Sequence, residues 1–549
     1  MKAANWEKFL IVWALLTFLA LGCLWIEYPG LHYDETLFVF ASYPRIPGGS
    51  LFQIDLFGRP FTFMLMPYLG GLKGWMYRVI LEAVPASALT ARLPMLLLGA
   101  LTIFLLYKLT RRTLGAVAAL VAAWLTATDP TYLFTTRLDW GPVVIQRLCL
   151  VLGCFLVVRW YQERRDRFAF AAFFVFGVAL FDKISFHWLL VGLAVGALAA
   201  FPRELWQGLR RRIVALALVG LLLGAYPFLY YRWSKPGAET SLGVTFEDNS
   251  RKFLEKYWML TRSLDGSVLQ GWVSNISADT VADPPDAAAR TLYQWMDVQQ
   301  RLGPSWFLPA LLGSVLLLPF SLRSCFGRVL LFLLLFCVTV WAQMFVIKNA
   351  GSVHHIVLMY PFPQLFAATT VAFLHEWIAS RTGPRVAVST TVVITLLLVF
   401  GNVRSTAHQY AQILRYGSAA VWTDAIYPLG EYLIARKPER VLVLDWGIGS
   451  QLHFLSRNKM PQTGVPDVIE NTAPATRLLE DWIDKPGILY VAYASDDLRV
   501  FPKTFGLFQE IAAGRGRDPR LEKTFEDRNG RPIFSVYSVM GTREEPKSP

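Results

Sequence analysis

The sequence predicts a mainly α-helical polytopic membrane protein with a soluble α/β domain at its C-terminal end. Of the 549 residues, 54% are hydrophobic and only 17% are charged, whereas an ordinary soluble domain carries about 25% charged residues. Many apolar stretches are long enough to span a bilayer, which takes roughly 17 to 25 residues. Beyond residue 402 this pattern ends, and short apolar strands alternate with helical stretches.

Eleven apolar stretches define the predicted membrane spans. The first is too long for a signal-peptide core and lacks a small-residue cleavage site, so we interpret it as a retained helix. The predicted spans lie near residues 8–27, 92–110, 114–134, 141–160, 168–181, 184–201, 212–232, 304–321, 328–347, 353–374 and 384–402.

Basic residues orient these spans. With a cytoplasmic N-terminus, every connection on the inner side holds two to four Lys or Arg, as the positive-inside rule requires. This orientation accounts for the net charge of +13 without a nucleic-acid partner. Residues 28–91, 233–303 and 403–549 then lie outside the cytoplasm. Because no eukaryotic targeting signal is found, we expect a bacterial inner membrane with these regions on the periplasmic side.

The three outer regions differ in character. Residues 28–91 are too apolar for a solvated loop, and their aromatic segments at 61–68 and 72–81 are expected to be short interfacial helices that lie in the membrane interface. Residues 233–303 are more polar, with helices expected near 248–262 and 286–301. We therefore predict a transmembrane domain over residues 1–402 and an exported α/β domain over 403–549.

The C-terminal region carries its own strand signals. Apolar runs at 441–445 and 488–492 indicate buried strands. Asn529-Gly530 lies between two further strand-like segments, 521–527 and 533–539, which is the signal of a β-hairpin.

The first candidate site is the acidic pair Asp34-Glu35, just past the outer end of the first span. Adjacent carboxylates point in different directions, so we expect one to do chemistry and the other to position it. In the alternative interpretation, Asp34 caps a short helix over 36–42 and both acids are favoured by the helix dipole.

Arginines supply the next candidates. Arg59 precedes an aromatic segment and could hold a lipid phosphate, or merely anchor at the headgroups. Arg137 and Asp139 share a short turn between the third and fourth spans. Arg147 lies inside the fourth span, where a charge should face a polar cavity unless it extends to the interface.

The remaining candidates are Asp182-Lys183, His354-His355 and Tyr360. The acid–lysine pair either takes part in the site or neutralises itself at the outer interface. The adjacent histidines would point apart on a helix and lack the spacing of a zinc motif, so phosphate binding by one of them is favoured over a metal. All these groups map to the outer side, which indicates one cavity for a substrate that is partly lipid and partly charged.

These residues bring the chain close to a known family. It resembles the GT-C membrane glycosyltransferases, in the branch that holds protein O-mannosyltransferases and the lipid A aminoarabinose transferase, over roughly residues 5–402. The motifs that carry the resemblance occur in the family's order: Asp34-Glu35, Arg59-Pro60, Ala91-Arg92-Leu93-Pro94, Tyr107 with Arg111-Arg112 and Gly115, Asp129-Pro130, Arg137, Lys183 and Tyr360-Pro361.

The resemblance implies a sugar donor linked to polyprenyl phosphate and a single-step, inverting transfer at the outer face. Asp34 would take the proton from an acceptor hydroxyl or amine as general base. Arg59, Lys183 and Arg147 would stabilise the charge on the departing lipid phosphate. No cofactor is then required; a divalent metal is possible but not indicated. The acceptor would be a glycolipid, a glycan or a protein.

The chain also departs from the family. Pro142 stands where many relatives carry a second outer-loop carboxylate, and Asp139 is the nearest acid. Together with Arg137 it would orient the sugar or the acceptor. Arg59 replaces a lysine, and the glycine that usually follows Lys183 is missing.

Two other functions remain open. An oligosaccharide ligase would use a polyprenyl-diphosphate donor and need more positive charge. A lipid or solute transporter would show inverted repeats and charges at the bilayer midplane, but no repeat is found and the charges gather at one face.

Overall fold

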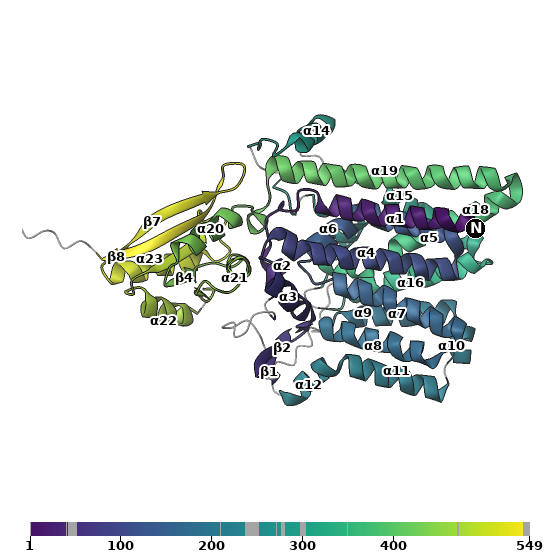
Figure 1. Ribbon diagram of the computed structural model, residues 1–549, viewed down its shortest axis with the longest axis horizontal. Helices are drawn as coiled ribbons and strands as arrows, with labels where there is room; N and C mark the ends of the chain where they lie inside the picture. The colour runs from purple at the N-terminus through teal and green to yellow at the C-terminus, as the bar shows by residue number, and fades with distance from the viewer. Residues whose placement is uncertain are drawn as a thin grey trace, which may run out of the picture.

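The computed structural model describes residues 2–39, 41, 52–56, 58–208, 210–235, 252–270, 272–275, 280–296, 303–347, 350–468 and 471–541. A bundle of long helices fills one side of the molecule, and a domain built on a β-sheet stands at one end of it (Figure 1). The short elements that follow the first helix lie between these two parts.

Each of the predicted spans falls on a helix or on a bent pair of helices. The elements of the bundle are α1 (Lys2–Cys23), α4 (Ala88–Thr113), α5 (Gly115–Thr128), α6 (Pro130–Leu138), α7 (Val144–Glu163), α8 (Asp166–Asp182), α9 (Phe186–Ala200), α10 (Pro202–Gly208), α11 (Arg211–Gly224), α12 (Tyr226–Ser234), α15 (Phe307–Ser321), α16 (Cys325–Gln343), α17 (Val353–Ile356), η3 (Val357–Met359), α18 (Phe362–Thr382) and α19 (Pro384–Tyr416).

By length and hydropathy, six helices among the described residues are able to cross a membrane, and up to nine if each bent pair counts as one span. The bends are 58° between α5 and α6, 106° between α9 and α10, and 64° between α11 and α12. Helices α8 and α15, with 17 and 15 residues, are not counted among these spans. The chain is therefore an integral, multi-pass membrane protein.

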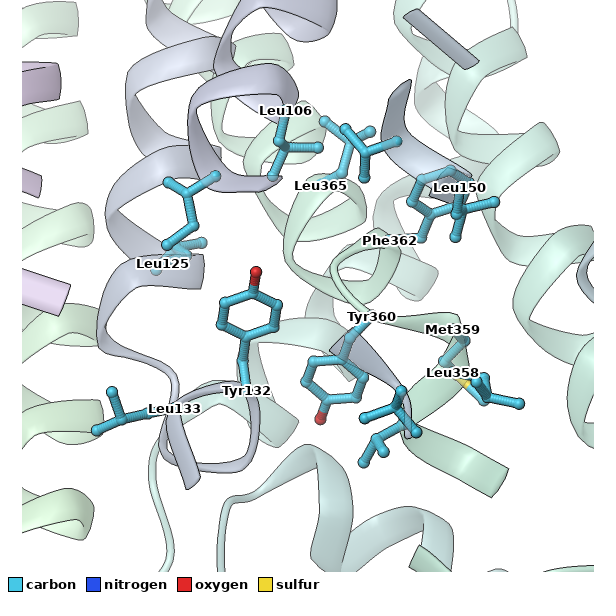
Figure 2. Packing of buried hydrophobic residues seen from close by; sticks show 14 of the residues in the cluster. Leu106, Leu125, Tyr132, Leu133, Leu150, Leu358, Met359, Tyr360, Phe362 and Leu365 are labelled. Carbon is cyan, nitrogen blue, oxygen red and sulfur yellow. The ribbon is translucent and has the colours of Figure 1, made fainter. Parts of the chain in front are cut away.

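The bend between α5 and α6 shows how polar residues shape the interior. Asp129 caps α6 by accepting a hydrogen bond from the Tyr132 backbone N–H at 2.7 Å, and Pro130 occupies the first helical position. Gln364 of α18 donates to the second Asp129 oxygen at 2.8 Å. Around this junction the buried apolar side chains of α4, α5, α7 and α18 interlock (Figure 2).

The first outer region contains α2 (Tyr33–Leu37), a sheet of β1 (Phe52–Leu56), β2 (Arg59–Met66) and β3 (Leu69–Gly70), and α3 (Leu72–Ala83). The helix expected at 72–81 is confirmed, but the interfacial piece at 61–68 is mostly a strand. It holds the aromatic residues Phe61 and Phe63 around the β-branched Thr62, residue types that favour a strand. Pairing with β1 through a turn at Gly58 satisfies the backbone.

The second outer region holds α13 (Phe253–Leu264) and α14 (Ala287–Trp295), close to the two helices expected there. Asp286 caps α14 and also accepts a hydrogen bond from the Trp25 indole N–H at 2.8 Å.

The long helix α19 overruns the predicted domain boundary at 402. It continues to Tyr416 because its polar residues are buried against the outer region: Gln409 donates to the Leu269 carbonyl at 3.1 Å, and Gln270 donates to the Ser405 hydroxyl at 3.3 Å. Falling hydropathy therefore marks the end of the membrane-spanning part and not the end of the helix.

The C-terminal domain has one five-stranded sheet in the order β5-β4-β6-β8-β7. The predicted strands and the hairpin are confirmed: β4 and β6 run parallel, and β8 and β7 add antiparallel at one edge. The elements after α19 are η4 (Ala420–Trp422), α20 (Ile426–Arg436), β4 (Arg440–Val443), α21 (Gly449–Leu455), β5 (Gln462–Gly464), α22 (Ala473–Trp482), β6 (Ile488–Tyr493), α23 (Pro502–Gly514), β7 (Arg517–Glu526) and β8 (Pro532–Gly541).

Helices cover both faces of this sheet. Val441 and Val443 pack with α20 and α21 on one face, whereas Leu442 and Leu444 pack with α22 and α23 on the other. This alternation is what a strand buried on both faces requires.

The domain contacts the bundle at two places. Helix α21 packs on α2, where the Ser450 hydroxyl donates to the Tyr33 carbonyl at 2.7 Å. The β7–β8 turn contacts the second outer region, where the Asn529 amide donates to the Thr280 carbonyl at 2.9 Å. The sheet domain is therefore held directly over α2.

Candidate active site

Helix α2 is held in place by its own first residues. The His32 side chain accepts a hydrogen bond from the Asp34 backbone N–H at 3.1 Å, and Glu35 accepts one from the His32 backbone N–H at 3.2 Å, which together form a capping box. His32 also stacks on Trp422, with ring centroids 4.1 Å apart. The alternative in which Asp34 caps a helix over 36–42 is wrong, because His32 is the cap.

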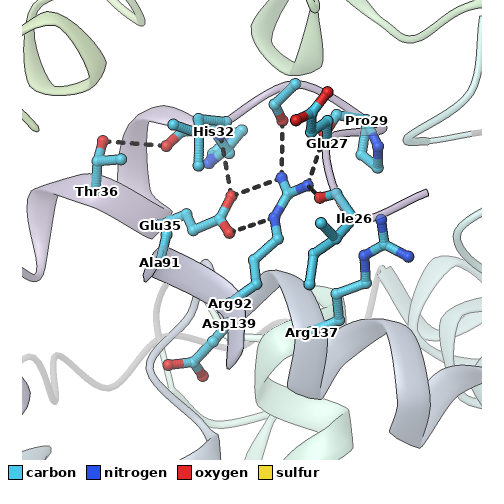
Figure 3. Close-up of polar contacts among 12 residues, drawn as sticks. Ile26, Glu27, Pro29, His32, Glu35, Thr36, Ala91, Arg92, Arg137 and Asp139 are labelled. Carbon is cyan, nitrogen blue, oxygen red and sulfur yellow. Dashed lines mark hydrogen bonds and ion pairs between the residues drawn. The ribbon is translucent and has the colours of Figure 1, made fainter. Parts of the chain in front are cut away.

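Glu35 is a buried partner of Arg92, and the two side chains are 2% and 0% exposed. Arg92 Nε donates to one Glu35 oxygen at 2.7 Å and Nη2 to the other at 3.1 Å. The same guanidinium donates to the carbonyls of Pro29 at 2.8 Å and Gly30 at 3.0 Å (Figure 3). Both oxygens of Glu35 are therefore engaged in tying α2 to the preceding loop, which gives Glu35 a positioning role.

Asp34 is the opposite case. Its side chain is half-buried, and within the described part of the chain its carboxylate has no hydrogen-bond or ion-pair partner. Burial raises the pKa of Asp34 to about 6, although the charges of Lys183 and Lys73 act to lower it. A carboxylate with this pKa is ionised at neutral pH and still basic enough to accept a proton.

Lys183 lies in the connection between α8 and α9 and is 6% exposed. Its Nζ donates to the Gly141 carbonyl at 2.9 Å, and burial lowers the pKa of this lysine to about 8. The neighbouring Asp182 is buried with one oxygen lacking any partner among the described residues. Among the described residues no ion pair joins the two side chains, although the charge of Asp182 acts to raise the pKa of Lys183, so the self-neutralising alternative stays open.

Lys73 of α3 forms a buried ion pair with Asp139, with Nζ 2.9 Å from Oδ2 and both side chains at most 3% exposed. The other Asp139 oxygen accepts hydrogen bonds from the Val143 and Val144 backbone N–H groups at 2.9 and 3.1 Å. Asp139 therefore caps the start of α7 and anchors Lys73. We refer to Asp34, Lys73, Asp139, Asp182 and Lys183 as the Asp34 cluster, because electrostatic interactions link its members.

Arg137 and Arg147 do not reach this cluster with free donors. Arg137 is fully buried, and its terminal nitrogens donate to the Leu24, Trp25 and Tyr28 carbonyls and to the Tyr410 hydroxyl. Arg147 donates to the Val357 carbonyl at 3.0 Å and to two threonine hydroxyls. The substrate-binding roles expected for both stay predictions, and the Arg137 Nε has no partner among the described residues. Each guanidinium satisfies backbone or hydroxyl oxygens at helix breaks and loop ends.

The histidines and Tyr360 lie around α17. The Tyr360 hydroxyl donates to the Ser263 carbonyl at 2.7 Å, and its ring is fully buried in the core (Figure 2), so the structure gives it a packing role. The rings of His354 and His355 are 4.1 Å apart, and both contact the Ser352 hydroxyl.

Of these three residues, His354 abuts the Asp34 cluster. A Cβ added at Gly141 would come within 2.2 Å of the His354 Cβ, so only glycine fits between this ring and the carbonyl that holds Lys183. No group of His, Cys, Asp and Glu in the described segments has the arrangement of a metal site.

Arg59 begins β2, directly after the Gly58 turn. Its side chain lies outside the described residues, so its expected contact with a lipid phosphate stays a prediction.

Two members of the site were not identified from the sequence. Lys73 is charged and lies two residues after Gly70-Gly71, at the start of an apolar helix. It therefore shows the same signal as the other candidates, a charged residue near apolar surface. Tyr68 lies close enough to Asp34 for the carboxylate to help raise its pKa, after the larger effect of burial. Nothing in the local sequence marks Tyr68.

The arrangement combines two buried lysines with one carboxylate that has no partner among the described residues, at one end of the bundle. Such a site can accept a proton at Asp34 and attract an anion at the lysines. This site lies where the helical bundle meets the appended α/β domain.

Known proteins confirm the resemblance. A family model described as dolichyl-phosphate-mannose-protein mannosyltransferase matches residues 72–231, which include Lys73, Asp139 and Lys183 but not Asp34. No sequence match is found among curated proteins.

Solved structures extend the likeness over almost the whole chain. ArnT from Cupriavidus metallidurans in the apo state matches with a TM-score of 0.61 at 13% identity, covering 98% of both chains. ArnT from the same organism bound to undecaprenyl phosphate matches with a TM-score of 0.55 at 14% identity, covering 97% of this chain and 98% of the other. The archaeal oligosaccharyltransferase AglB from Archaeoglobus fulgidus, in complex with an inhibitory peptide and a dolichol-phosphate, gives 0.51 at 11% identity and covers 100% and 75%. At these identities the likeness establishes the fold.

Proposed function

We propose that the protein is a membrane glycosyltransferase that moves a sugar from a polyprenyl-phosphate donor to an acceptor hydroxyl or amine at the outer face of the membrane. The observation that carries this proposal is the Asp34 carboxylate, which has no partner among the described residues and interacts electrostatically with two buried lysines. The family-model match and the fold shared with ArnT, a relative crystallised with undecaprenyl phosphate, support the class of donor.

The reaction is a single inverting displacement. The acceptor oxygen or nitrogen attacks the anomeric carbon and forms the new glycosidic bond, while the bond from that carbon to the phosphate oxygen breaks. The proton of the acceptor passes to Asp34, and the polyprenyl phosphate leaves with the bonding electron pair. A positioned base of this kind contributes about 10²- to 10⁴-fold to the rate.

The lysines stabilise the leaving group. Lys183 has three N–H donors and uses one on the Gly141 carbonyl, so it retains donors for a phosphate oxygen. Lys73 adds positive charge from α3, and its ion pair with Asp139 holds the lysine in place. Arg59 is proposed as a further phosphate ligand. Fixed positive charges in a site of low dielectric stabilise an anion more strongly than water does.

The proposed setting is the periplasmic side of a bacterial inner membrane. The excess of Lys and Arg on the opposite connections supports this orientation, since α2, which carries Asp34, and the sheet domain lie at the other end of the bundle (Figure 1).

The test uses purified protein and a panel of synthetic polyprenyl-phosphate monosaccharides, with a polyprenyl-diphosphate oligosaccharide included. We expect free polyprenyl phosphate to be released from at least one monosaccharide donor, and Asp34→Asn to abolish the release. Release from the diphosphate donor alone would identify an oligosaccharide ligase instead. Binding of the lipids without any release would favour a transporter.

A further inference from the structure

The carboxyl ends of the parallel strands in the C-terminal sheet face the Asp34 cluster. Helix α21, which follows β4, packs on one face of the sheet, whereas α23, which follows β6, packs on the other. Ligands of open α/β sheets bind where neighbouring strands send their following helices to opposite faces. In this protein that point adjoins α2, since Trp446 lies against Tyr33 with ring centroids 5.0 Å apart.

The crevice itself is closed by the protein. Asp445, at the end of β4, accepts hydrogen bonds from the Val500 and Phe501 backbone N–H groups at 3.1 and 3.2 Å. Gly447 then turns the chain with a φ of 88°, and a Cβ there would come within 2.7 Å of the Tyr493 hydroxyl. The tight turn presents Trp446 outward, toward α2.

The surface beside this turn has unused polar groups. Tyr33 and Trp446 are both half-buried, and in the described segments neither the phenol hydroxyl nor the indole N–H has a hydrogen-bond partner. Asp34 and the exposed Asp467 are both close enough to Tyr33 to raise its pKa, after the effect of burial. Two aromatic rings in contact therefore lie near two carboxylates, and their hydroxyl and indole N–H have no partner in the described segments.

We infer that Trp446, Tyr33 and Asp467 form a subsite for a carbohydrate ring of the acceptor, so that the acceptor is a glycan or the glycan part of a glycolipid. A sugar ring has apolar C–H faces and a rim of hydroxyl groups, which matches aromatic rings bordered by carboxylates and free donors. This inference rests on the proposed function and names the acceptor class for it.

The position of the subsite distinguishes acceptor from donor. Lys73 and Lys183 reach Asp34 from the bundle, through α3 and the α8–α9 connection, whereas Trp446 and Asp467 belong to the sheet domain. In an inverting displacement the leaving group and the attacking group lie on opposite sides of the anomeric carbon. With the phosphate at the lysines, the acceptor has to approach from the side of the sheet domain.

A peptide acceptor fits this surface less well. Extended peptides bind by adding a strand to an open sheet edge. The edge strand nearest Asp467 is β5, which has three residues and is flanked by Pro461 and Pro466. Proline cannot donate to a strand ladder, and so short an edge offers little pairing.

The experiment compares three variants in the full-length protein with its preferred donor, using envelope oligosaccharides and a Ser/Thr-containing peptide as alternative acceptors. We expect transfer to the oligosaccharide, with Trp446→Ala raising its KM at least tenfold, Trp446→Phe restoring most of this loss, and Asp467→Asn raising KM severalfold. Trp482→Ala is the matched control, because Trp482 lies in α22 on the face of the sheet away from α21. It should leave the KM for the acceptor at the wild-type value.

Transfer to the peptide but not to the oligosaccharide would overturn the inference, as would an unchanged acceptor KM in Trp446→Ala. A rise in the donor KM equal to that of the acceptor would also overturn it, since it would mean that Trp446 only supports α2. In each of these cases Asp34-dependent donor cleavage would persist, so the proposed function would stand.

If no donor is cleaved, saturation-transfer NMR with the oligosaccharide tests the subsite separately. A signal that is lost in Trp446→Ala but kept in Trp482→Ala supports the subsite, and the absence of a signal with the wild type rejects it.

Discussion

Two neighbouring groups of buried charges differ in what their partners are. The arginine group (Arg92, Arg137 and Arg147) donates to backbone carbonyls, hydroxyls and one buried carboxylate, so its hydrogen-bonding capacity is largely used within the protein. Among the described residues, the Asp34 cluster retains a carboxylate without a partner at Asp34, one such oxygen at Asp182 and spare donors at Lys183, whereas in the arginine group only the Arg137 Nε is buried without a partner. A buried charge in a membrane protein thus indicates function only where some of its hydrogen-bond donors or acceptors have no partner within the protein.

This comparison predicts its largest effect at Asp34. Asp34→Asn keeps the shape of the side chain but removes the proton acceptor, so we expect the transfer rate to fall by about 10³- to 10⁴-fold with an unchanged melting temperature. Single-turnover donor cleavage measures the rate, and thermal unfolding of the purified protein measures stability. Glu35→Gln is the matched control: it should mainly lower the melting temperature. Normal turnover by Asp34→Asn would place the base elsewhere.

At Arg92 the effect should be on folding. Arg92→Leu leaves Glu35 buried without its partner, which should destabilise the protein by about 3 to 5 kcal/mol. Tryptophan fluorescence during thermal unfolding in detergent would report the change. The double variant Glu35→Leu with Arg92→Leu should recover part of the loss. An Arg92→Leu protein as stable as the wild type would mean that the loop over residues 26–30 is held by other contacts.

Lys183 should affect the rate and its dependence on pH. Lys183→Ala removes one cation from the leaving phosphate and should lower the rate by about 10²-fold. Because the pKa values of Asp34 and Lys183 are about 6 and 8, the wild-type rate should rise through pH 6, as Asp34 loses its proton, and fall above pH 8, as Lys183 becomes neutral.

Two substitutions separate these limbs of the pH profile. In Lys183→Arg the positive charge persists at high pH, so the fall above pH 8 should disappear. In Lys183→Ala the charge that lowers the pKa of Asp34 is missing, so the acidic limb should move to higher pH. Profiles of kcat/KM between pH 5 and 10 test both, and an acidic limb that stays in place would show that Lys183 is not near Asp34 in the working enzyme.

The smallest effect is expected at Tyr410, which belongs to the surroundings of the arginine group. Its hydroxyl accepts from Arg137 and donates to the Leu21 carbonyl at 2.6 Å. Tyr410→Phe should cost about 1 kcal/mol of stability and leave the pH profile of the reaction unchanged. A shift of either limb would instead connect Arg137 with the reaction.

Much of the fold follows from the sequence, because hydropathy and strand signals report local physics. The helices of the bundle, β4, β6 and the hairpin at Asn529-Gly530 all lie where these signals place them. The end of α19 and the strand over 59–66 were missed for a common reason. In both segments the decisive partner is another segment: the region around Leu269, distant in the sequence, for the Gln409 side chain, and the preceding strand β1 for β2.

The candidate site could be predicted only in part. Asp34 and Lys183 stand out as charges beside apolar segments, and the structure links them. Arg137 and Arg147 stand out in the same way, yet they are engaged by carbonyls and hydroxyls whose positions depend on the tertiary fold. Lys73 has the same sequence signal but was missed, and its pairing with Asp139 places it in the site. The sequence therefore identifies charged residues that lie near apolar segments. The fold determines which of them keep hydrogen-bond donors or acceptors without a partner.

The turn between β7 and β8 has a consequence for biosynthesis. Arg531 donates to the Ser418 carbonyl at 2.9 Å and Asn529 to the Thr280 carbonyl at 2.9 Å, so nearly the last described residues complete the docking of the sheet domain over α2, which emerges among the first. A chain that is still being synthesised already contains Lys73 and Lys183 but does not yet have the complete sheet domain. We expect such nascent chains, and truncations that end before residue 517, to be open to water and prone to degradation, which pulse-chase labelling of a truncation series would measure.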